Sequence, residues 1–331
     1  MRYIALEEAF SIPGLDDRQP SPWLGLPLSQ RHLADWARKL PDFTEYRLPE
    51  MDAAGIDVQV LSLTVPGLQA DADPAIARDD ARFANDYLAQ VIAEHPDRFR
   101  GFAALPMQNP SAAAAELARC VHELGFCGAL VNDHLQGHYL DEPQYDEVWA
   151  ALEELSVPLY LHPGAPPADR WKVLDGRPEL YGATWSWAAE VGGHALRIIY
   201  GGVFDRHPGA TLILGHMGEL LPFMLTRTNN VLRGSPTLPD VGAKMELSLA
   251  DYVHRNIHIS ISGFFTDPPL RCALDTIGAD RIMFAVDHPF GDDAAGRRFL
   301  DEAAITDEER EKIAHLNAER LLRIGSPRSA G

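Results

Sequence analysis

The sequence predicts an α/β protein, a (β/α)8 TIM barrel with loop insertions at its active-site face. Short apolar, β-rich segments alternate with longer helical patterns, and eight such segments occur. No GxGxxG follows the first of them and no Walker lysine motif appears, so an open nucleotide-binding sheet lacks its signature. The expected strands are residues 3–7, 58–63, 101–105, 127–131, 157–161, 211–215, 257–261 and 281–286.

Helical patterns occupy the intervals between these strands, as a barrel requires. Their apolar residues recur at helical spacing. No change in composition marks a second unit, and barrels commonly reach ~250 residues or more as one domain. Residues 1–331 are therefore expected to form a single barrel domain. The expected helices include 75–95, 111–124, 143–155, 185–201, 219–232 and 267–277.

Three insertions interrupt the alternation. Residues 11–29 and 163–184 begin where the first and fifth strands end, so we expect them to form walls of a pocket. Residues 234–243 separate two helical segments and are expected to be a plain surface connection.

Composition excludes several classes of function. The net charge of −19 argues against nucleic acid or an anionic membrane as a partner. Cys120, Cys127 and Cys272 form no metal-type pair, which predicts free thiols in a reducing compartment. No segment has the ~7–15 apolar residues of a signal peptide at the N-terminus, or the ~18 of a membrane helix. We therefore expect a cytoplasmic protein.

Five polar residues stand at or just after the ends of expected strands. Parallel barrel strands point their C-terminal ends to one mouth, so these side chains should converge there. Glu, His and Asp in one cleft are ligands for a divalent metal, which predicts an enzyme. The five are Glu7 in YIALEEAF, Asn132 in ALVND, His162 in LYLHP, His216 in LILGHMGE and Asp287 in IMFAVDHPF.

Each candidate has a structural alternative. Glu7 could be a solvated strand end, because Glu8 follows it, and His162 could be a hydrogen-bonded core residue. Glu219 could bond to the imidazole of His216 or simply favour a helix N-terminus. Asp287 could begin a loop, although a carboxylate after a buried run is costly without a cation or donors.

Other candidates carry weaker signals. Arg227 follows GHMGE by about two helical turns and could hold a substrate carboxylate, or lie on the surface. His194 lies on a helical pattern and is expected to pack. His134 and His138 have i, i+4 spacing, but no helix is expected there, so a metal role is not favoured. The aromatic residues of FMLTR and WSWAA are expected to belong mostly to the core.

Nearly the whole chain resembles the metal-dependent decarboxylases of the amidohydrolase superfamily that act on hydroxybenzoates, such as γ-resorcylate, 2,3-dihydroxybenzoate and salicylate decarboxylases. The motifs that carry the resemblance, in order along the chain, are LEEAF, PDRFRGFAALPMQNP, GFCGALVND, HP, GVFDRHP, GHMGE, GADRIMFAVD and FAVDHPF.

The resemblance implies that Glu7, His162 and Asp287 bind one divalent metal. Several members carry a histidine two residues after the glutamate, where this chain has Ala9. One fewer nitrogen ligand shifts the preference from Zn²⁺ towards Mn²⁺ or Mg²⁺. His288 stands where many relatives have an aromatic residue, so the shape of the pocket is expected to differ.

The resemblance also implies a reaction. An ortho-hydroxylated aromatic acid would lose CO₂ after Asp287 protonates the ring carbon that bears the carboxylate. His216 and Glu219 would hold or deprotonate the phenol. From their positions in the chain, Trp23, Asn132, Arg227 and His288 are expected to contact the small aromatic substrate. The resemblance implies a homodimer or homotetramer. The alternatives are a metal-dependent hydrolase of a lactone or amide, and a relative that has lost its metal.

Overall fold

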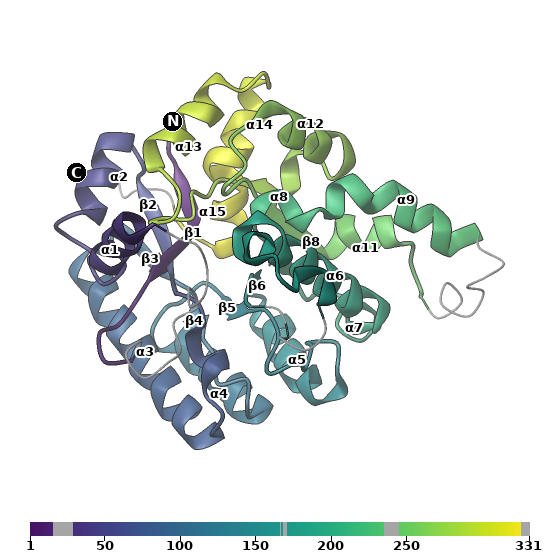
Figure 1. The fold of residues 1–331 in the computed structure, drawn as a ribbon, viewed down its shortest axis with the longest axis horizontal. Coiled ribbons are helices and arrows are strands. Elements are labelled where there is room, and N and C mark those ends of the chain that lie inside the picture. Colours follow the sequence, from purple (N-terminus) through teal and green to yellow (C-terminus); the bar gives the residue numbers. More distant parts are fainter. Residues whose placement is uncertain (16–28, 166, 168–170, 235–244, 326–331) are drawn as a thin grey trace.

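A computed structural model describes residues 1–15, 29–165, 167, 171–234 and 245–325. Parallel strands form the centre and helices surround them (Figure 1). The strands are β1 (Ile4–Phe10), β2 (Val58–Leu63), β3 (Phe99–Gly101), β4 (Ala103–Ala104), β5 (Ala129–Asn132), β6 (Leu159–His162), β7 (Leu212–Leu214), β8 (Ile257–Ser260) and β9 (Ile282–Met283).

The nine described strands fill eight positions of the barrel, because β3 and β4 follow one another along the same position. The pairing order is β1-β2-β3 in one sheet and β4-β5-β6-β7-β8-β9 in the other. Phe102, between β3 and β4, donates its amide to Leu61 O, and Cys127 donates to Gly101 O, so one strand pairs on both sides. The expected strand at 101–105 is thus displaced towards the N-terminus and interrupted.

Strand β1 is longer than expected and contains an irregularity. The register with β2 runs from Ala5 opposite Gln59 to Glu8 opposite Leu61, so β1 holds one extra residue. A bulge of this kind re-aims side chains next to an active site. Glu7 and Glu8 are both buried as a result, with 2% and 0% of their surfaces exposed.

The helices generally match the expected intervals and often begin at Pro-containing caps. Asp73 precedes Pro74, Asn109 precedes Pro110, and each side chain accepts an amide hydrogen of the first turn. The helices are α1 (Gln30–Lys39), α2 (Arg47–Ala54), α3 (Pro74–Glu94), α4 (Pro110–His122), α5 (Asp146–Leu155), α6 (Ser186–Tyr200), α7 (Val203–Arg206), α8 (His216–Glu219), α9 (Leu221–Gly234), α11 (Leu249–Asn256), α12 (Asp267–Thr276), α13 (Asp293–Glu302), α14 (Asp307–Glu311) and α15 (Asn317–Leu322).

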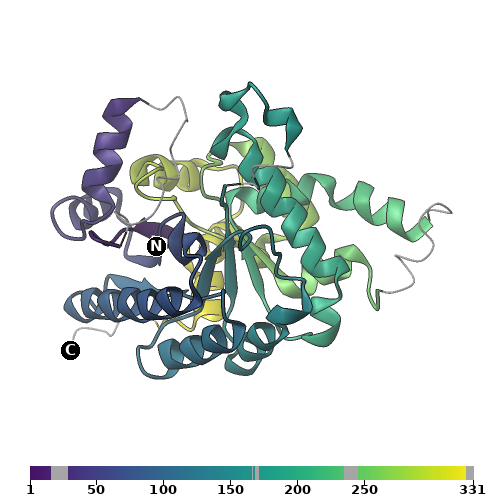
Figure 2. The same cartoon turned by 60° about the horizontal axis from the view of Figure 1, so that its bottom comes forward.

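Alternate strand residues divide the core into two clusters. Ala5, Leu61 and Leu161 pack with the surrounding helices, whereas their neighbours Leu6, Val60 and Tyr160 belong to a separate inner cluster. Residues of α15 complete this inner cluster, which fills the barrel. Helix α9 extends outward beside α11 (Figures 1 and 2). No helix within the described ranges is long and apolar enough to cross a membrane.

Candidate active site

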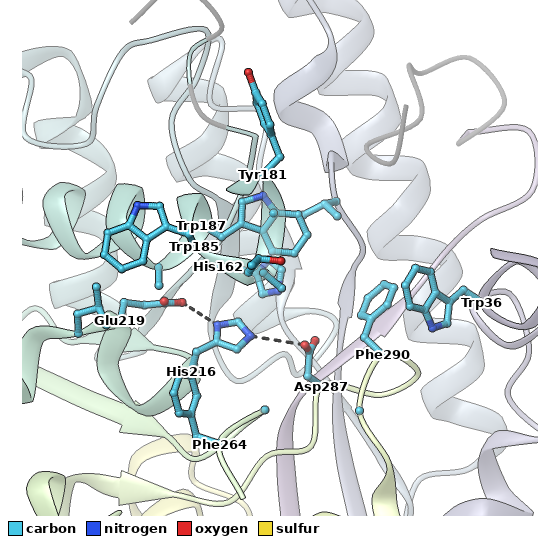
Figure 3. A pocket seen from close by; sticks show the side chains of 18 residues that line it. Trp36, His162, Tyr181, Trp185, Trp187, His216, Glu219, Phe264, Asp287 and Phe290 are labelled. Carbon is cyan, nitrogen blue, oxygen red and sulfur yellow. Dashed lines mark hydrogen bonds and ion pairs between the residues drawn. The ribbon is translucent and has the colours of Figure 1, made fainter. Parts of the chain in front are cut away.

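A cavity of about 420 Å³ lies at the C-terminal ends of the strands. Its histidine and carboxylate side chains are His162, His216, Glu219 and Asp287, and its described lining contains no lysine or arginine. Figure 3 shows His216 between Glu219 and Asp287, with aromatic side chains around them. The aromatic walls are Trp36, Tyr181, Trp185, Trp187, Phe264 and Phe290.

Three side chains from β1, β6 and the segment after β9 meet beside this cavity. Glu7, His162 and Asp287 each offer one ligand atom, and these atoms all lie within 4.8 Å of one another. His162 Nδ1 lies 2.9 Å from Pro163 O and 3.0 Å from Asn132 Oδ1. The hydrogen therefore belongs on Nδ1, and Nε2, which is 3.8 Å from Glu7 Oε1, keeps its lone pair. A second partner that fixes the tautomer is typical of a ligating histidine.

Glu7 provides the clearest indication that a cation belongs here. Its Oε2 accepts hydrogen bonds from Ser260, at 2.8 Å, and from Ser262. Its Oε1 is buried and has no hydrogen-bond partner within the described protein. Burial would raise the pKa of Glu7, but His216, His162 and the Ser262 hydroxyl lower it below its ordinary value. An ionised oxygen left unpaired among other ligand atoms fits a divalent cation.

A strained turn presents His216 to the cavity. His216, Met217, Glu219 and Leu220 all have positive φ, between 46° and 67°, a region that non-glycine residues rarely adopt. This turn, labelled α8, brings His216 Nδ1 to 2.7 Å from Glu219 Oε1. On the other side of the ring, Nε2 lies 3.5 Å from Asp287 Oδ2 and 3.6 Å from Glu7 Oε1.

For both His216 and Asp287, burial and at least one neighbouring group shift the pKa in opposite directions. Burial would lower the pKa of His216, but Glu7 and Glu219 raise it well above its ordinary value. Burial raises the pKa of Asp287 to about 6, although its hydrogen bond with His216 opposes the shift. The site thus contains groups that can hold or transfer protons near neutral pH.

Three of the four expected substrate contacts lie outside the described lining of the cavity. Asn132 is buried behind His162, because its side chain bonds to the imidazole. His288 is buried and faces Asp293, because the left-handed backbone at Asp287 turns the next side chain away. Arg227 is exposed on α9, which leaves the barrel. Trp23 lies outside the described residues.

Several lining residues were not anticipated from the sequence. Trp185 was expected in the core, yet it is 47% exposed and lines the cavity with Trp187. The aromatic density of WSWAA after a pocket-forming insertion was an available signal. Ser260 and Ser262 were also missed, although serines at alternate positions of ISISG mark one face of a strand end. The expectation that residues 163–184 contribute a wall is confirmed, since Tyr181–Thr184 line the cavity.

Comparisons with known proteins identify the family of this chain. Residues 26–324 match the amidohydrolase family. The chain is 42% identical over 327 residues to γ-resorcylate decarboxylase of Rhizobium sp. (strain MTP-10005), covering 97% of this chain and 98% of that protein.

Two solved structures show the same fold. One is 2,6-dihydroxybenzoate decarboxylase complexed with 2,6-dihydroxybenzoate, with a TM-score of 0.90 and 41% identity over 98% of this chain and 100% of the other. The second is 5-carboxyvanillate decarboxylase from Novosphingobium aromaticivorans DSM 12444 with manganese and 4-hydroxy-3-methoxy-5-nitrobenzoic acid. Its TM-score is 0.91, with 32% identity over 98% of this chain and 96% of the other. The chain therefore belongs to the amidohydrolase family, and within that family it is a decarboxylase.

Proposed function

We propose that this enzyme decarboxylates an ortho-hydroxylated aromatic acid without oxidation, and that Asp287 supplies the proton. In this reaction a C–H bond forms at the ring carbon bearing the carboxylate. The C–C bond to the carboxylate then breaks, its electron pair stays on the ring, and CO₂ leaves. The observation that carries the proposal is that Asp287 lines an aromatic cavity beside His216, with its Oδ2 3.5 Å from His216 Nε2.

The donor set fits one divalent metal per subunit. Glu7, His162 and Asp287 would hold it, because their ligand atoms lie together and Glu7 Oε1 has no other partner. Two carboxylates and one imidazole form a hard donor set, so we propose Mn²⁺, with Zn²⁺ and Mg²⁺ as the ions to compare. When bound, the ion supplies a Lewis acid for the carboxylate and phenolic oxygens of the substrate.

His216 and Glu219 would bind the phenolic hydroxyl group of the substrate or accept its proton. Glu219 accepts the hydrogen of His216 Nδ1 and so directs Nε2 towards the cavity. The protonated imidazole can donate a hydrogen bond from Nε2 to a phenolic oxygen, and the neutral imidazole can take the phenolic proton. The paired carboxylate also keeps the ring from rotating out of position.

The cavity walls suit an aromatic ring. Trp185 and Trp187 lie on one side, and Phe290 with Trp36 on another (Figure 3). Aromatic faces stack on a flat substrate and exclude water, which keeps the transferred proton from exchanging. No lysine or arginine in the described lining competes for the carboxylate.

We also propose that the protein is a homodimer or homotetramer. Three apolar side chains on α9, Phe223, Met224 and Val231, are 79%, 39% and 46% exposed, and such clusters often mark contacts between proteins. Light scattering of the purified protein tests this, and a monomeric mass would contradict it.

The test of the reaction is a decarboxylation assay with enzyme stripped of metal and reloaded with Mn²⁺, Zn²⁺ or Mg²⁺. 2-Hydroxybenzoate and 2,6-dihydroxybenzoate are compared with 4-hydroxybenzoate, which lacks the ortho hydroxyl. CO₂ release is expected only from the first two. Lactones are assayed in parallel, and acid release from them without CO₂ from any hydroxybenzoate would favour the hydrolase alternative.

Asp287→Asn tests the residue that carries the proposal. Asparagine keeps an oxygen near the metal ligands but cannot deliver the proton, so kcat should fall by about 10²- to 10⁴-fold. Metal content measured on the same sample separates loss of the proton from loss of the ion. A variant with full metal content and a near-normal rate would refute the role of Asp287 as the acid.

A further inference from the structure

We propose that Glu8 is a positioning residue that sets the conformation of Asp287. Asp287 has a φ of 71°, in the left-handed region that costs a non-glycine residue free energy. Its conformation must therefore be held by its surroundings. Glu8 Oε1 accepts the amide hydrogen of Val286 at 2.9 Å, and Glu8 Oε2 accepts that of His288 at 2.8 Å. One carboxyl group thus fixes the residues on both sides of Asp287.

The place of these hydrogen bonds in the fold explains why a side chain is needed. Among the described strands, β9 is paired with β8 but not with β1, so no ladder closes the barrel at this seam. The backbone contributes a bond from the Ala9 amide to His288 O, at 2.8 Å. Glu8 adds two more across the seam and takes the place of the missing ladder.

The bulge in β1 and a buried arginine make this use of Glu8 feasible. The extra residue in β1 allows Glu7 to reach the candidate metal ligands while the adjacent Glu8 reaches the seam. Arg47 is fully buried, donates to Ala9 O and to Gln59 Oε1, and interacts electrostatically with Glu8. Burial and Asp293 raise the pKa of Glu8 to about 8, and the positive charge of Arg47 opposes part of this shift.

Glu8 acts through the backbone and does not line the cavity. It would position one metal ligand and proton donor before metal or substrate arrives, in the way that residues behind a site orient those that touch it. This inference depends on the proposed role of Asp287 for its effect on turnover. Its effect on metal affinity depends only on the ligand set.

Glu8→Gln is the direct test, because glutamine has nearly the same shape but replaces one acceptor with an NH₂ group. That group faces an amide hydrogen, so one of the two bonds is lost. We expect kcat for CO₂ release or Mn²⁺ affinity, measured by electron paramagnetic resonance of free Mn²⁺, to fall about 10- to 100-fold. Unchanged kcat and Mn²⁺ affinity in folded Glu8→Gln would overturn the proposal.

Asn317→Ala is the matched control. Asn317 is also buried and its side chain also holds this part of the chain, donating to Ala279 O and Ile282 O at 2.7 and 2.8 Å. Those bonds lie at the start of β9, away from the site. The variant should lower Tm without changing Mn²⁺ affinity. If both variants lower Mn²⁺ affinity in proportion to Tm, Glu8 is only structural and the proposal fails.

Hydrogen exchange of the wild-type enzyme keeps the proposal testable if Glu8→Gln does not fold. The amides of Val286 and His288 should stay protected after the metal is removed, because Glu8 holds them. Rapid exchange at both positions in the metal-free enzyme would overturn the proposal. If Asp287→Asn keeps its rate while Glu8→Gln loses Mn²⁺ affinity, the proposed acid is wrong but the positioning role stands.

Discussion

Two clusters in this barrel contain the same kinds of residues but differ in which side-chain atoms remain available to bind a metal ion. Glu7, His162 and Asp287 form the first, at the mouth. Asp133, His134 and Glu190 form the second, and in both clusters one ligand atom from each residue lies within 4.8 Å of the others. Residue type and proximity alone would assign a metal to each.

One side-chain atom of each residue in the second cluster forms a hydrogen bond within the protein. Asp133 Oδ1 accepts from His194 Nδ1 at 2.8 Å, and Glu190 Oε1 accepts from the Tyr139 hydroxyl. His134 Nδ1 accepts the Gly137 amide at 3.1 Å, so Nε2 of the neutral ring carries the hydrogen. That nitrogen has no lone pair to offer a cation. Each cluster leaves one buried carboxylate oxygen without a hydrogen-bond partner in the described part of the chain, Glu7 Oε1 in the first and Asp133 Oδ2 in the second. The free lone pair of His162 Nε2 is therefore what distinguishes the first cluster as a metal site.

The metal content of variants should show the largest difference between the two clusters. Glu7→Gln removes the carboxylate whose Oε1 has no described hydrogen-bond partner, and it should reduce bound Mn²⁺ from about one ion per chain to a small fraction. Asp133→Asn should retain the ion, because His134 in the second cluster has no imidazole lone pair to offer a cation. Elemental analysis of both variants after dialysis checks this. Two ions per wild-type chain, or loss of an ion in Asp133→Asn, would show that the second cluster binds metal.

The histidine–carboxylate pairs provide a second, smaller contrast. His216 with Glu219 faces the cavity, whereas His194 with Asp133 is buried behind it. Glu219→Gln should lower kcat about 10- to 100-fold with little change in Tm, because the tautomer of His216 is no longer fixed. His194→Asn should instead lower Tm and leave kcat nearly unchanged. Steady-state rates and thermal melts of both variants are the measurement, and the reverse pattern would contradict the assignment.

The smallest expected effect is on the pH dependence of stability. Burial raises the pKa of Asp133 from 3.8 to about 8, with Glu190 adding to the shift and His134 opposing it. Between these values the folded state binds more protons than the unfolded state, so this residue makes stability fall as pH rises from about 4 to about 8. Asp133→Asn should make the decline of Tm between pH 5 and pH 8 shallower. Equal slopes in the two proteins would show that Asp133 does not carry the raised pKa.

The residues at the strand ends could be predicted from the sequence, because the C-terminal ends of all strands in a parallel barrel lie at one mouth. An apolar run that stops at a histidine or carboxylate marks the mouth of a parallel barrel, so Glu7, His162 and Asp287 were brought together correctly. Their role as metal ligands remains a prediction. Strand alternation does not predict the direction of the Glu8 side chain, because a bulge inserts one residue into β1. No local sequence pattern indicates this bulge.

Residues near the site in sequence were harder to place than the strand ends. His288 adjoins Asp287 and Arg227 follows the GHMGE turn, yet neither lines the cavity. Left-handed backbone at Asp287 and from His216 to Leu220 changes the direction of the chain at these points. Single-residue φ values of this kind depend on tertiary contacts such as those of Glu8, and sequence spacing does not reveal them.

Gly215 shows how such contacts constrain which residues can occur together. Its φ of −69° would suit almost any amino acid, so the requirement for glycine is not conformational. A Cβ at this position would collide with Glu7 Oε1, from a strand more than two hundred residues away. Positions 7 and 215 should therefore vary as a pair during evolution. A relative with a side chain at 215 must have either another residue at position 7 or a carboxylate there that is displaced from the position seen here.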